Sequence, residues 1–322
     1  MKKFKKITAV AMAIAMTCAI TACDDKKSSD TYTIGICQLV QHEALDDATK
    51  GFKDALKEKL GDKVEFDEQN ASGEKTNCTT IISQFVSSNV DLIMANATDA
   101  LTAAVSATED IPIVGTSITD YATALQIEDW KGTTGMNVTG TADLAPLKEQ
   151  AAMIKELCPD KKTVGILYCS NEANSKYQAD IIKSELEGLG YTCKIYTFVD
   201  TNDVTAITQT AVDSSDVLYI PTDNTAASNT EAINNITEPA KIPVFTGEEG
   251  ICKGCGVATL SISYYDIGFR AGEMAYEILE NGAKPEEMKI DYSTDLTKKY
   301  VAKRAETLNL KIPESYKPIT MD

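Results

Sequence analysis

The chain has 322 residues, with 31 Lys or Arg against 48 Asp or Glu and a single His, so its formal net charge at pH 7 is −17. This excess of acidic residues argues against binding to nucleic acid, because phosphate backbones are bound through basic surfaces. A single histidine makes a histidine-rich metal site or a Ser-His-Asp triad hard to build. We therefore expect no metal, no other cofactor and no ordinary hydrolase.

The N-terminal segment predicts export and a lipid anchor. Residues 2–6 are basic, residues 7–20 form a short apolar run, and a small residue precedes Cys23. This order resembles a bacterial lipoprotein signal, in which residues 1–22 are removed and the sulfur of Cys23 is diacylated. A plain secretory signal with a chance cysteine is the alternative. Residues 23–31 are polar and would carry the anchor and a tether, so we expect a protein held at the cell membrane, facing the extracytoplasmic side, through its lipid alone.

The rest of the chain alternates between strand and helix patterns. Short apolar or β-branched runs, typical of buried strands, lie at 33–37, 64–69, 90–96, 111–117, 163–169, 193–199, 217–221, 243–247 and 257–263. Helical patterns lie at 45–60, 74–88, 98–108, 143–157, 173–189, 202–213 and 264–281. The alternation predicts an α/β fold with parallel sheets covered by helices. Similar runs open at Ile34 and Val164, so we interpret the chain as two doubly wound lobes rather than one large sheet.

The loops after the predicted strands carry hydroxyl, amide and carboxylate side chains. In open parallel sheets, ligands bind beyond the carboxyl ends of the strands and beside helix N-termini. This mixture of side chains suits a small zwitterion held between two lobes. The candidate ligand-binding residues in these loops are Gln38, His42, Thr98, Asp99, Ser117, Thr119, Ser170, Asn171, Asn174, Asp223, Asn224, Glu248, Tyr264 and Tyr265.

Specific roles follow for the two charged ends of such a ligand. We expect its carboxylate at a helix N-terminus, where the helix dipole favours an anion, since the chain has only two arginines. Its ammonium would pair with Asp223 or Glu248. Helix capping is the alternative role, and the more frequent one for any single residue of this kind. It is open for Thr98, Ser170, Asn171 and Asp223. The same choice applies to His42, for which we favour ligand binding.

Cysteines give no disulfide framework. Besides Cys18 and Cys23 there are seven, an odd number that cannot all pair within the chain. The only CxxC joins Cys252 and Cys255, and a redox pair, half a zinc site and a loop disulfide are all open to it. A zinc site needs two more ligands at suitable local spacing, which the chain does not offer. We interpret the motif as a structural loop that can be oxidised.

Six blocks stand out in chain order: Ile34–Asp46, Asp91–Thr98, Asn137–Gly140, Asn171–Ser175, Pro221–Asn224 and Tyr264–Gly268. As an ordered set they resemble the ABC-type substrate-binding lipoproteins that bind tryptophan and related aromatic amino acids. The resemblance spans nearly all of residues 31–312 and adds Asn137 to the candidate ligand residues. One departure is Gln41-His42-Glu43, where we would expect proline after an acidic residue and a histidine.

The resemblance implies a type I periplasmic-binding-protein fold, with two lobes joined by three crossings. The crossings would lie near Thr119–Tyr121, Ser263–Tyr264 and Tyr292–Thr294. Lobe 1 would then comprise residues 31–118 plus 264–291, and lobe 2 residues 119–263 plus 292–322. The implied function is capture of tryptophan, tyrosine or phenylalanine between the lobes, and delivery to a membrane permease that works with a cytoplasmic ATPase.

Two other classes of function compete with this interpretation. A surface adhesin could keep the same fold and contact a host or partner, alone or in addition to transport. An enzyme is disfavoured, because the sequence contains no nucleophile elbow, P-loop or zincin pattern. Neighbouring acids such as Asp46 and Asp47 are usually a solvated face.

Overall fold

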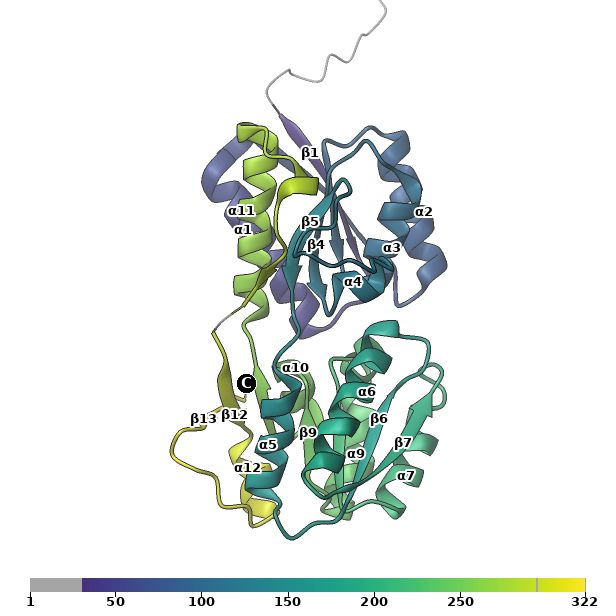
Figure 1. Cartoon of the computed structure of the whole chain (residues 1–322), viewed down its shortest axis with the longest axis vertical. Coiled ribbons are helices and arrows are strands. Elements are labelled where there is room, and N and C mark those ends of the chain that lie inside the picture. Colours follow the sequence, from purple (N-terminus) through teal and green to yellow (C-terminus); the bar gives the residue numbers. More distant parts are fainter. Residues whose placement is uncertain (1–30, 294, 322) are drawn as a thin grey trace, which may run out of the picture.

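The computed structural model of the chain describes residues 31–293 and 295–321, which form two α/β lobes, one above the other in Figure 1. The predicted signal peptide (1–22), the lipidation site Cys23 and residues 24–30 of the tether lie outside the described residues, as does Thr294. Within the described part, no helix has the length and apolar character needed to cross a membrane.

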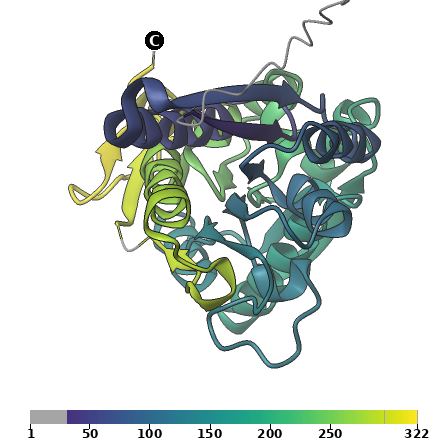
Figure 2. The ribbon, with the colours of Figure 1, turned by 90° about the horizontal axis from the view of Figure 1, so that it is seen from above.

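Lobe 1 contains a six-stranded parallel sheet in the order β11-β5-β4-β3-β1-β2. Its strands are β1 (Tyr32–Gln38), β2 (Val64–Asn70), β3 (Leu92–Asn96), β4 (Ile113–Ile118), β5 (Val138–Ala142) and β11 (Asp291–Tyr292). Its helices are α1 (Glu43–Leu60), α2 (Lys75–Ser87), α3 (Thr98–Ala107), α4 (Tyr121–Ala124) and α11 (Tyr264–Asn281), with 3-10 turns at Gly61–Lys63 and Pro285–Glu287. Helices α1 and α11 pack together on one face of the sheet, and α2 and α3 on the other (Figure 2).

Alternation along the strands explains this layering. Ile34 and Ile36 of β1 pack with α1 and α11, whereas Cys37 joins the core under α2 and α3. Successive side chains of a strand point to opposite faces, so a sheet covered on both sides needs apolar residues at nearly every position. All five residues of β3 are buried accordingly.

Lobe 2 contains a seven-stranded sheet in the order β13-β12-β10-β9-β8-β6-β7. Its strands are β6 (Thr163–Cys169), β7 (Thr192–Phe198), β8 (Val217–Ile220), β9 (Val244–Thr246), β10 (Ala258–Ser261), β12 (Thr297–Tyr300) and β13 (Lys317–Pro318). Its helices are α5 (Leu147–Leu157), α6 (Ala173–Gly188), α7 (Val204–Asp213), α8 (Asn224–Ser228), α9 (Thr230–Ala240), α10 (Glu249–Cys255) and α12 (Ala302–Thr307). The sheet is parallel except where β12 runs antiparallel to β10. The predicted α/β class with two doubly wound lobes is therefore confirmed.

The first crossing between the lobes lies later in the chain than expected. The prediction that lobe 2 begins at Thr119 is wrong, because β5 pairs in parallel with β4 and so belongs to lobe 1. The chain crosses at residues 143–146, between β5 and α5. The strand was missed because Gly and Thr dominate it, and Gly140 is needed there: a Cβ at that position would lie 2.0 Å from the Gly115 carbonyl oxygen.

The other two crossings follow from the element order. The second passes from β10 to α11 through residues 262–263, and the third lies between the end of β11 at Tyr292 and the start of β12 at Thr297. The crossings lie on one side of the molecule (Figure 1). The carboxyl ends of the parallel strands in each lobe point toward the other lobe.

Candidate functional site

The two lobes touch each other directly across the cleft. A ring nitrogen of His42, at the start of α1, lies 3.2 Å from Oδ1 of Asn224 in lobe 2. The ammonium of Lys253 on α10 lies 3.4 Å from the carboxylate of Glu43. Because these contacts join side chains from opposite lobes, the structure is a closed form of the two-lobe fold.

A cavity of about 300 Å³ lies between the lobes beside these contacts. Lobe 1 lines it with Gln41, His42 and Glu43, and lobe 2 with residues that include Glu248 and Lys253. A second, much narrower cavity is lined by Thr98 and Thr119 from lobe 1 and by Asn174 and Tyr177 from lobe 2, among others. The predicted loops therefore do meet at the lobe boundary.

The bulged end of β4 carries strain and an unpartnered hydroxyl. The register between β4 and β5 shifts between Gly115 and Ile118, and Ser117 adopts a φ of 57°. A non-glycine residue in the left-handed region is strained, by roughly 1 kcal/mol or more. The Ser117 side chain is buried, yet its hydroxyl has no hydrogen-bond partner among the described residues. Strain and an unmatched polar atom cluster at functional sites, so this strand end is a candidate position for ligand binding.

Helix N-termini divide into capped and uncapped. Four are capped by a side chain at the N-cap position: α4 by Asp120, α8 by Asp223, α10 by Glu248 and α11 by Ser263. The other eight α-helices of the described residues lack such a cap, among them α1, α3 and α6, whose first residues line the interlobe cavities. Helix α3 starts at Thr98, which lines the narrow interlobe cavity, and its N-cap is Ala97 with a φ of 88°. The first N–H groups of α3 are thus candidate anion donors at the cleft.

Asp223 caps α8, the role that was its alternative to ligand binding, and Glu248, for which we expected only a ligand role, caps α10. Asp223 is 1% exposed and accepts hydrogen bonds from the backbone N–H groups of Cys169 and Ala226, both at 2.7 Å. Burial, and then the nearby carboxylate of Glu172, raise the pKa of Asp223. Burial also raises the pKa of Glu248 to about 7, with smaller contributions from neighbouring acids.

Glu172 organises the lobe 2 side of the cleft, and sequence reasoning did not select it. Its carboxylate accepts hydrogen bonds from the backbone N–H groups of Asn224 (2.9 Å) and Thr225 (2.8 Å), and from the side chains of both residues. It also accepts from the amide of Asn174. Five donors on one carboxylate fix the start of α8, and with it Asn224, against lobe 1. An acid directly before a predicted helix was the only available sequence signal.

Three further predicted residues lie near the cleft but are engaged within the protein. Gln38 is buried and ties β1 to α1, since its amide donates to Asp46 (2.6 Å) and accepts from Thr49 (2.6 Å). Asp99 forms an ion pair with Lys75 at 3.3 Å. The amide of Asn174 donates to Thr222 O at 3.1 Å.

Two hydroxyls from distant segments of the chain meet on one carboxylate. The hydroxyls of Tyr264 and Thr119 both donate to Asp143, at 2.8 and 3.1 Å. Asp143 directly follows β5, the strand that was not predicted, and it was not among the candidate residues.

Four predicted residues lie away from the cleft: Asn137, Ser170, Asn171 and Tyr265. Asn137 precedes β5, so it lies at the amino end of the sheet, where its amide donates to Ile111 O at 2.7 Å. Ser170 and Asn171 are exposed and bond to carbonyls at the end of β7. Tyr265 donates to Asp54 on the surface of α1. One residue turns a helix by about 100°, so only the first of the two adjacent tyrosines can face the cleft.

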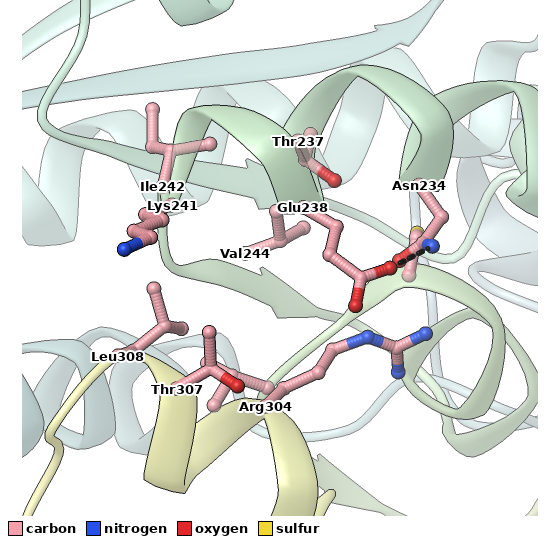
Figure 3. A pocket seen from close by; sticks show the side chains of 11 residues that line it. Asn234, Thr237, Glu238, Lys241, Ile242, Val244, Arg304, Thr307 and Leu308 are labelled. Carbon is pink, nitrogen blue, oxygen red and sulfur yellow. Dashed lines mark hydrogen bonds between the residues drawn. The ribbon is translucent and has the colours of Figure 1, made fainter.

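A crevice between α9 and α12 in lobe 2 does not qualify as the site (Figure 3). It has a volume of about 20 Å³, room for roughly one water molecule. Arg304, which borders it, donates to the carbonyls of Cys252, Lys253 and Gly256 at the end of α10. Its guanidinium is therefore committed to the backbone rather than to a ligand.

The CxxC motif is helical, so its interpretation as a loop is wrong. Cys252 and Cys255 lie on α10, are buried, and are free thiols like the other five cysteines in the described residues. Burial raises the pKa of both thiols, that of Cys255 to about 12. No group of three or more metal-ligating side chains occurs in residues 31–293 and 295–321.

Comparison with known proteins places this geometry in a family. The family model described as ABC transporter substrate binding protein matches residues 33–317. The tyrosine-binding protein of Clostridioides difficile (strain R20291) is 36% identical over 260 residues, which are 80% of this chain and 74% of that protein.

Two solved structures bear on the closed form. An ABC domain from Streptococcus pneumoniae in complex with L-Trp is 32% identical, with a TM-score of 0.84 over 88% of this chain and 97% of that one. A substrate-binding protein with adhesive properties from Clostridium difficile, in its ligand-free, open structure, is 33% identical, with a TM-score of 0.69 over 91% of this chain and 100% of that one. At nearly the same identity, the higher TM-score is with the ligand-bound structure, in keeping with the contacts of His42 and Glu43 across the cleft. The chain belongs to the ABC transporter substrate-binding protein family and has its type I periplasmic-binding-protein fold.

Proposed function

We propose that this protein captures an aromatic amino acid, tyrosine or tryptophan first and phenylalanine next, between its lobes, and delivers it to a membrane permease that works with a cytoplasmic ATPase. Two relatives with at least 32% identity are a tyrosine-binding protein and a domain in complex with L-Trp. The observation in the chain itself that carries the proposal is the unpartnered, buried hydroxyl of Ser117 at the strained end of β4.

The carboxylate of the ligand is assigned to this end of lobe 1. The uncapped first turn of α3 offers backbone N–H groups and the positive end of a ten-residue helix. Ser117 and Thr98 add hydroxyl donors from the neighbouring strand end and from the helix itself. These N–H and hydroxyl donors would bind the carboxylate in place of an arginine, which the cleft lacks.

Substitution of Ser117 by alanine tests the assignment. Ser117→Ala removes a hydroxyl that bonds nothing in the protein, so the free energy of unfolding stays equal or rises by up to about 1 kcal/mol. The affinity for L-tyrosine, measured by isothermal titration calorimetry, falls about tenfold, which is the value of one hydrogen bond to a charged group. Ser170→Ala is the matched control, because Ser170 is exposed beside β7 and should leave affinity unchanged. Equal affinities of the Ser117 variant and the wild type would contradict the assignment.

We also propose export and anchoring of the protein through diacylated Cys23. The order of basic, apolar and small residues before Cys23 supports it. So does the family, since a substrate-binding protein works beside its permease. Labelling of cells with a palmitate analogue tests the anchor: the wild type incorporates label and Cys23→Ser does not.

Surface adhesion is a second candidate function, favoured by one relative of 33% identity that is a substrate-binding protein with adhesive properties. Adhesion and capture differ in their dependence on the cleft. Cell binding that is unchanged by Ser117→Ala and by saturating L-tyrosine would support an adhesive surface outside the cleft.

A further inference from the structure

The hinge contains a fully buried carboxylate with an unusual set of partners. Asp143 is the first residue of the crossing from β5 to α5, is 4% exposed, and its backbone N–H donates to Ile118 O at 3.1 Å. It therefore lies directly beside the bulged end of β4 that carries Ser117.

Its carboxylate is held by neutral donors alone. Oδ1 accepts from the hydroxyl of Thr119 at 3.1 Å, and Oδ2 from the hydroxyl of Tyr264 at 2.8 Å. Tyr264 opens α11 directly after the second crossing, so two of the three crossings meet on this one side chain. Among the described residues, no Lys, Arg or His lies within ion-pair distance of Asp143.

The other buried acids of the cleft are compensated differently. Asp223, Glu172 and Glu248 each accept two backbone N–H groups, and these belong mainly to the first turns of α8 and α10. Helix N-termini stabilise a negative charge, which offsets part of the cost of burying these carboxylates, although burial still raises the pKa of Asp223 and of Glu248. Asp143 has only two hydroxyls, and an ionised carboxylate has acceptor sites for about four hydrogen bonds. A buried charge left in this state is costly unless a cation joins it.

Thr119 connects Asp143 to the cleft between the lobes. Thr119, which donates to Asp143, also lines the narrow interlobe cavity and accepts from the amide of Gln178 in lobe 2 at 3.5 Å. Asp143 is thus separated from the cleft by a single hydroxyl, on the same strand edge as the proposed carboxylate site. The charged ends of an α-amino acid are adjacent, so their protein partners have to be neighbours too.

We infer that Asp143 is the counter-ion for the α-ammonium group of the ligand. This inference rests on the proposed function, and it replaces Asp223 and Glu248, which are occupied as helix caps. Because the crossings meet on Asp143, an ammonium bound there engages the hinge as well as the cleft wall. Closure around the ligand and recognition of its amine then depend on the same side chain.

The test compares L-tyrosine with its desamino analogue, 3-(4-hydroxyphenyl)propionate, which keeps the ring and the carboxylate. Wild-type protein should bind L-tyrosine about 10- to 100-fold more tightly than the analogue by calorimetry, the range for a hydrogen-bonded charged group. The Asp143→Asn variant should bind L-tyrosine about 10- to 100-fold more weakly than the wild type does, and should bind the analogue with the same affinity as the wild type. The hydroxyls of Thr119 and Tyr264 can accept as well as donate, so they can bond the new amide and the fold is kept.

Two further variants separate recognition from structural damage. Tyr264→Phe removes a hydrogen bond to Asp143 but keeps the carboxylate, so the preference for the amine should persist. Asp216→Asn changes an acid that bonds the backbone N–H groups of Lys162 and Thr163 at the far end of lobe 2, and should bind like the wild type. An equal loss of both ligands in Asp143→Asn, or no loss, would overturn the role of Asp143 while leaving the proposed function standing. Failure of the wild type to bind tyrosine, tryptophan or phenylalanine would overturn both.

Discussion

Two contacts across the cleft at the start of α1, His42–Asn224 and Glu43–Lys253, should stabilise the closed form by a measurable amount, and we call this pair the latch. The hydrogen bond between His42 and Asn224 is partly buried and is worth about 1 kcal/mol. Glu43 and Lys253 have side chains that are 48% and 24% exposed, so their ion pair is worth about 0.5 kcal/mol. The double variant His42→Ala/Glu43→Gln should therefore destabilise the closed form by about 1.5 kcal/mol relative to the open form, which is roughly tenfold.

Calorimetry with L-tyrosine and small-angle scattering measure this effect. The ligand is held in the closed form, so the affinity of the double variant for L-tyrosine should fall by up to about tenfold. Without ligand, the variant should have a larger radius of gyration than the wild type. The part due to Glu43 disappears at high salt, because exposed charges are screened. A loss well above 100-fold would refute the latch and show that His42 contacts the ligand. Unchanged affinity and radius would show that these contacts contribute nothing.

His42 should also make the stability of the closed form depend on pH. Burial in the closed form lowers the pKa of His42, against smaller opposing effects of Asn224, Glu172 and Asp46. The open form binds the proton more readily, so closure is favoured above the ordinary pKa of about 6.5 and is lost as the pH falls through it. The affinity of the wild type should fall between about pH 7.5 and 5.5, and His42→Ala should flatten that part of the profile.

Three other predictions concern stability and reactivity. Burial raises the pKa of Glu248 from 4.5 to about 7, so its contribution to the free energy of unfolding is complete below pH 4.5 and is lost as the pH rises through 7. In chemical denaturation the free energy of unfolding of the wild type should fall by up to about 3 kcal/mol across that window relative to Glu248→Gln. Parallel pH profiles of the two proteins would contradict this. Gly268→Ala places a Cβ 2.0 Å from Ala48 O and should cost about 3 kcal/mol or more by separating α11 from α1, whereas Gly188→Ala, with nothing within 4 Å, should stay within about 1 kcal/mol of the wild type. Cys252 and Cys255 are buried with raised pKa values, so iodoacetamide should modify them only after unfolding, and rapid labelling of the native protein would contradict their placement.

Elements with strong periodicity could be predicted from the sequence within one or two residues. The helix expected at 264–281 is α11 to the residue, and the strand expected at 163–169 is β6. Both have apolar residues at nearly every buried position, so the pattern is long and unambiguous. Helix α9 was missed because it buries only Ile233 and Thr237 and contains Pro239. Strand β13 has only two residues, too few for any period.

The site could be predicted only in part, and for a physical reason. The rule that ligands lie beyond the carboxyl ends of strands selected His42, Thr98 and Asn224, which the structure places at the boundary between the lobes. It could not separate caps from ligand residues, because that depends on which backbone N–H groups each carboxylate reaches. Asp223 and Glu172 differ from Asp143 only in their partners, and those partners come from distant segments of the chain.

Direct titration of the protein with the twenty amino acids, by calorimetry at pH 7.5, tests the central claim most directly. We expect saturable binding at one site per chain for L-tyrosine or L-tryptophan, an affinity about tenfold weaker in Ser117→Ala, and much weaker binding of aliphatic and charged amino acids. Absence of binding by every aromatic amino acid, or a preference for an aliphatic or charged one, would contradict it.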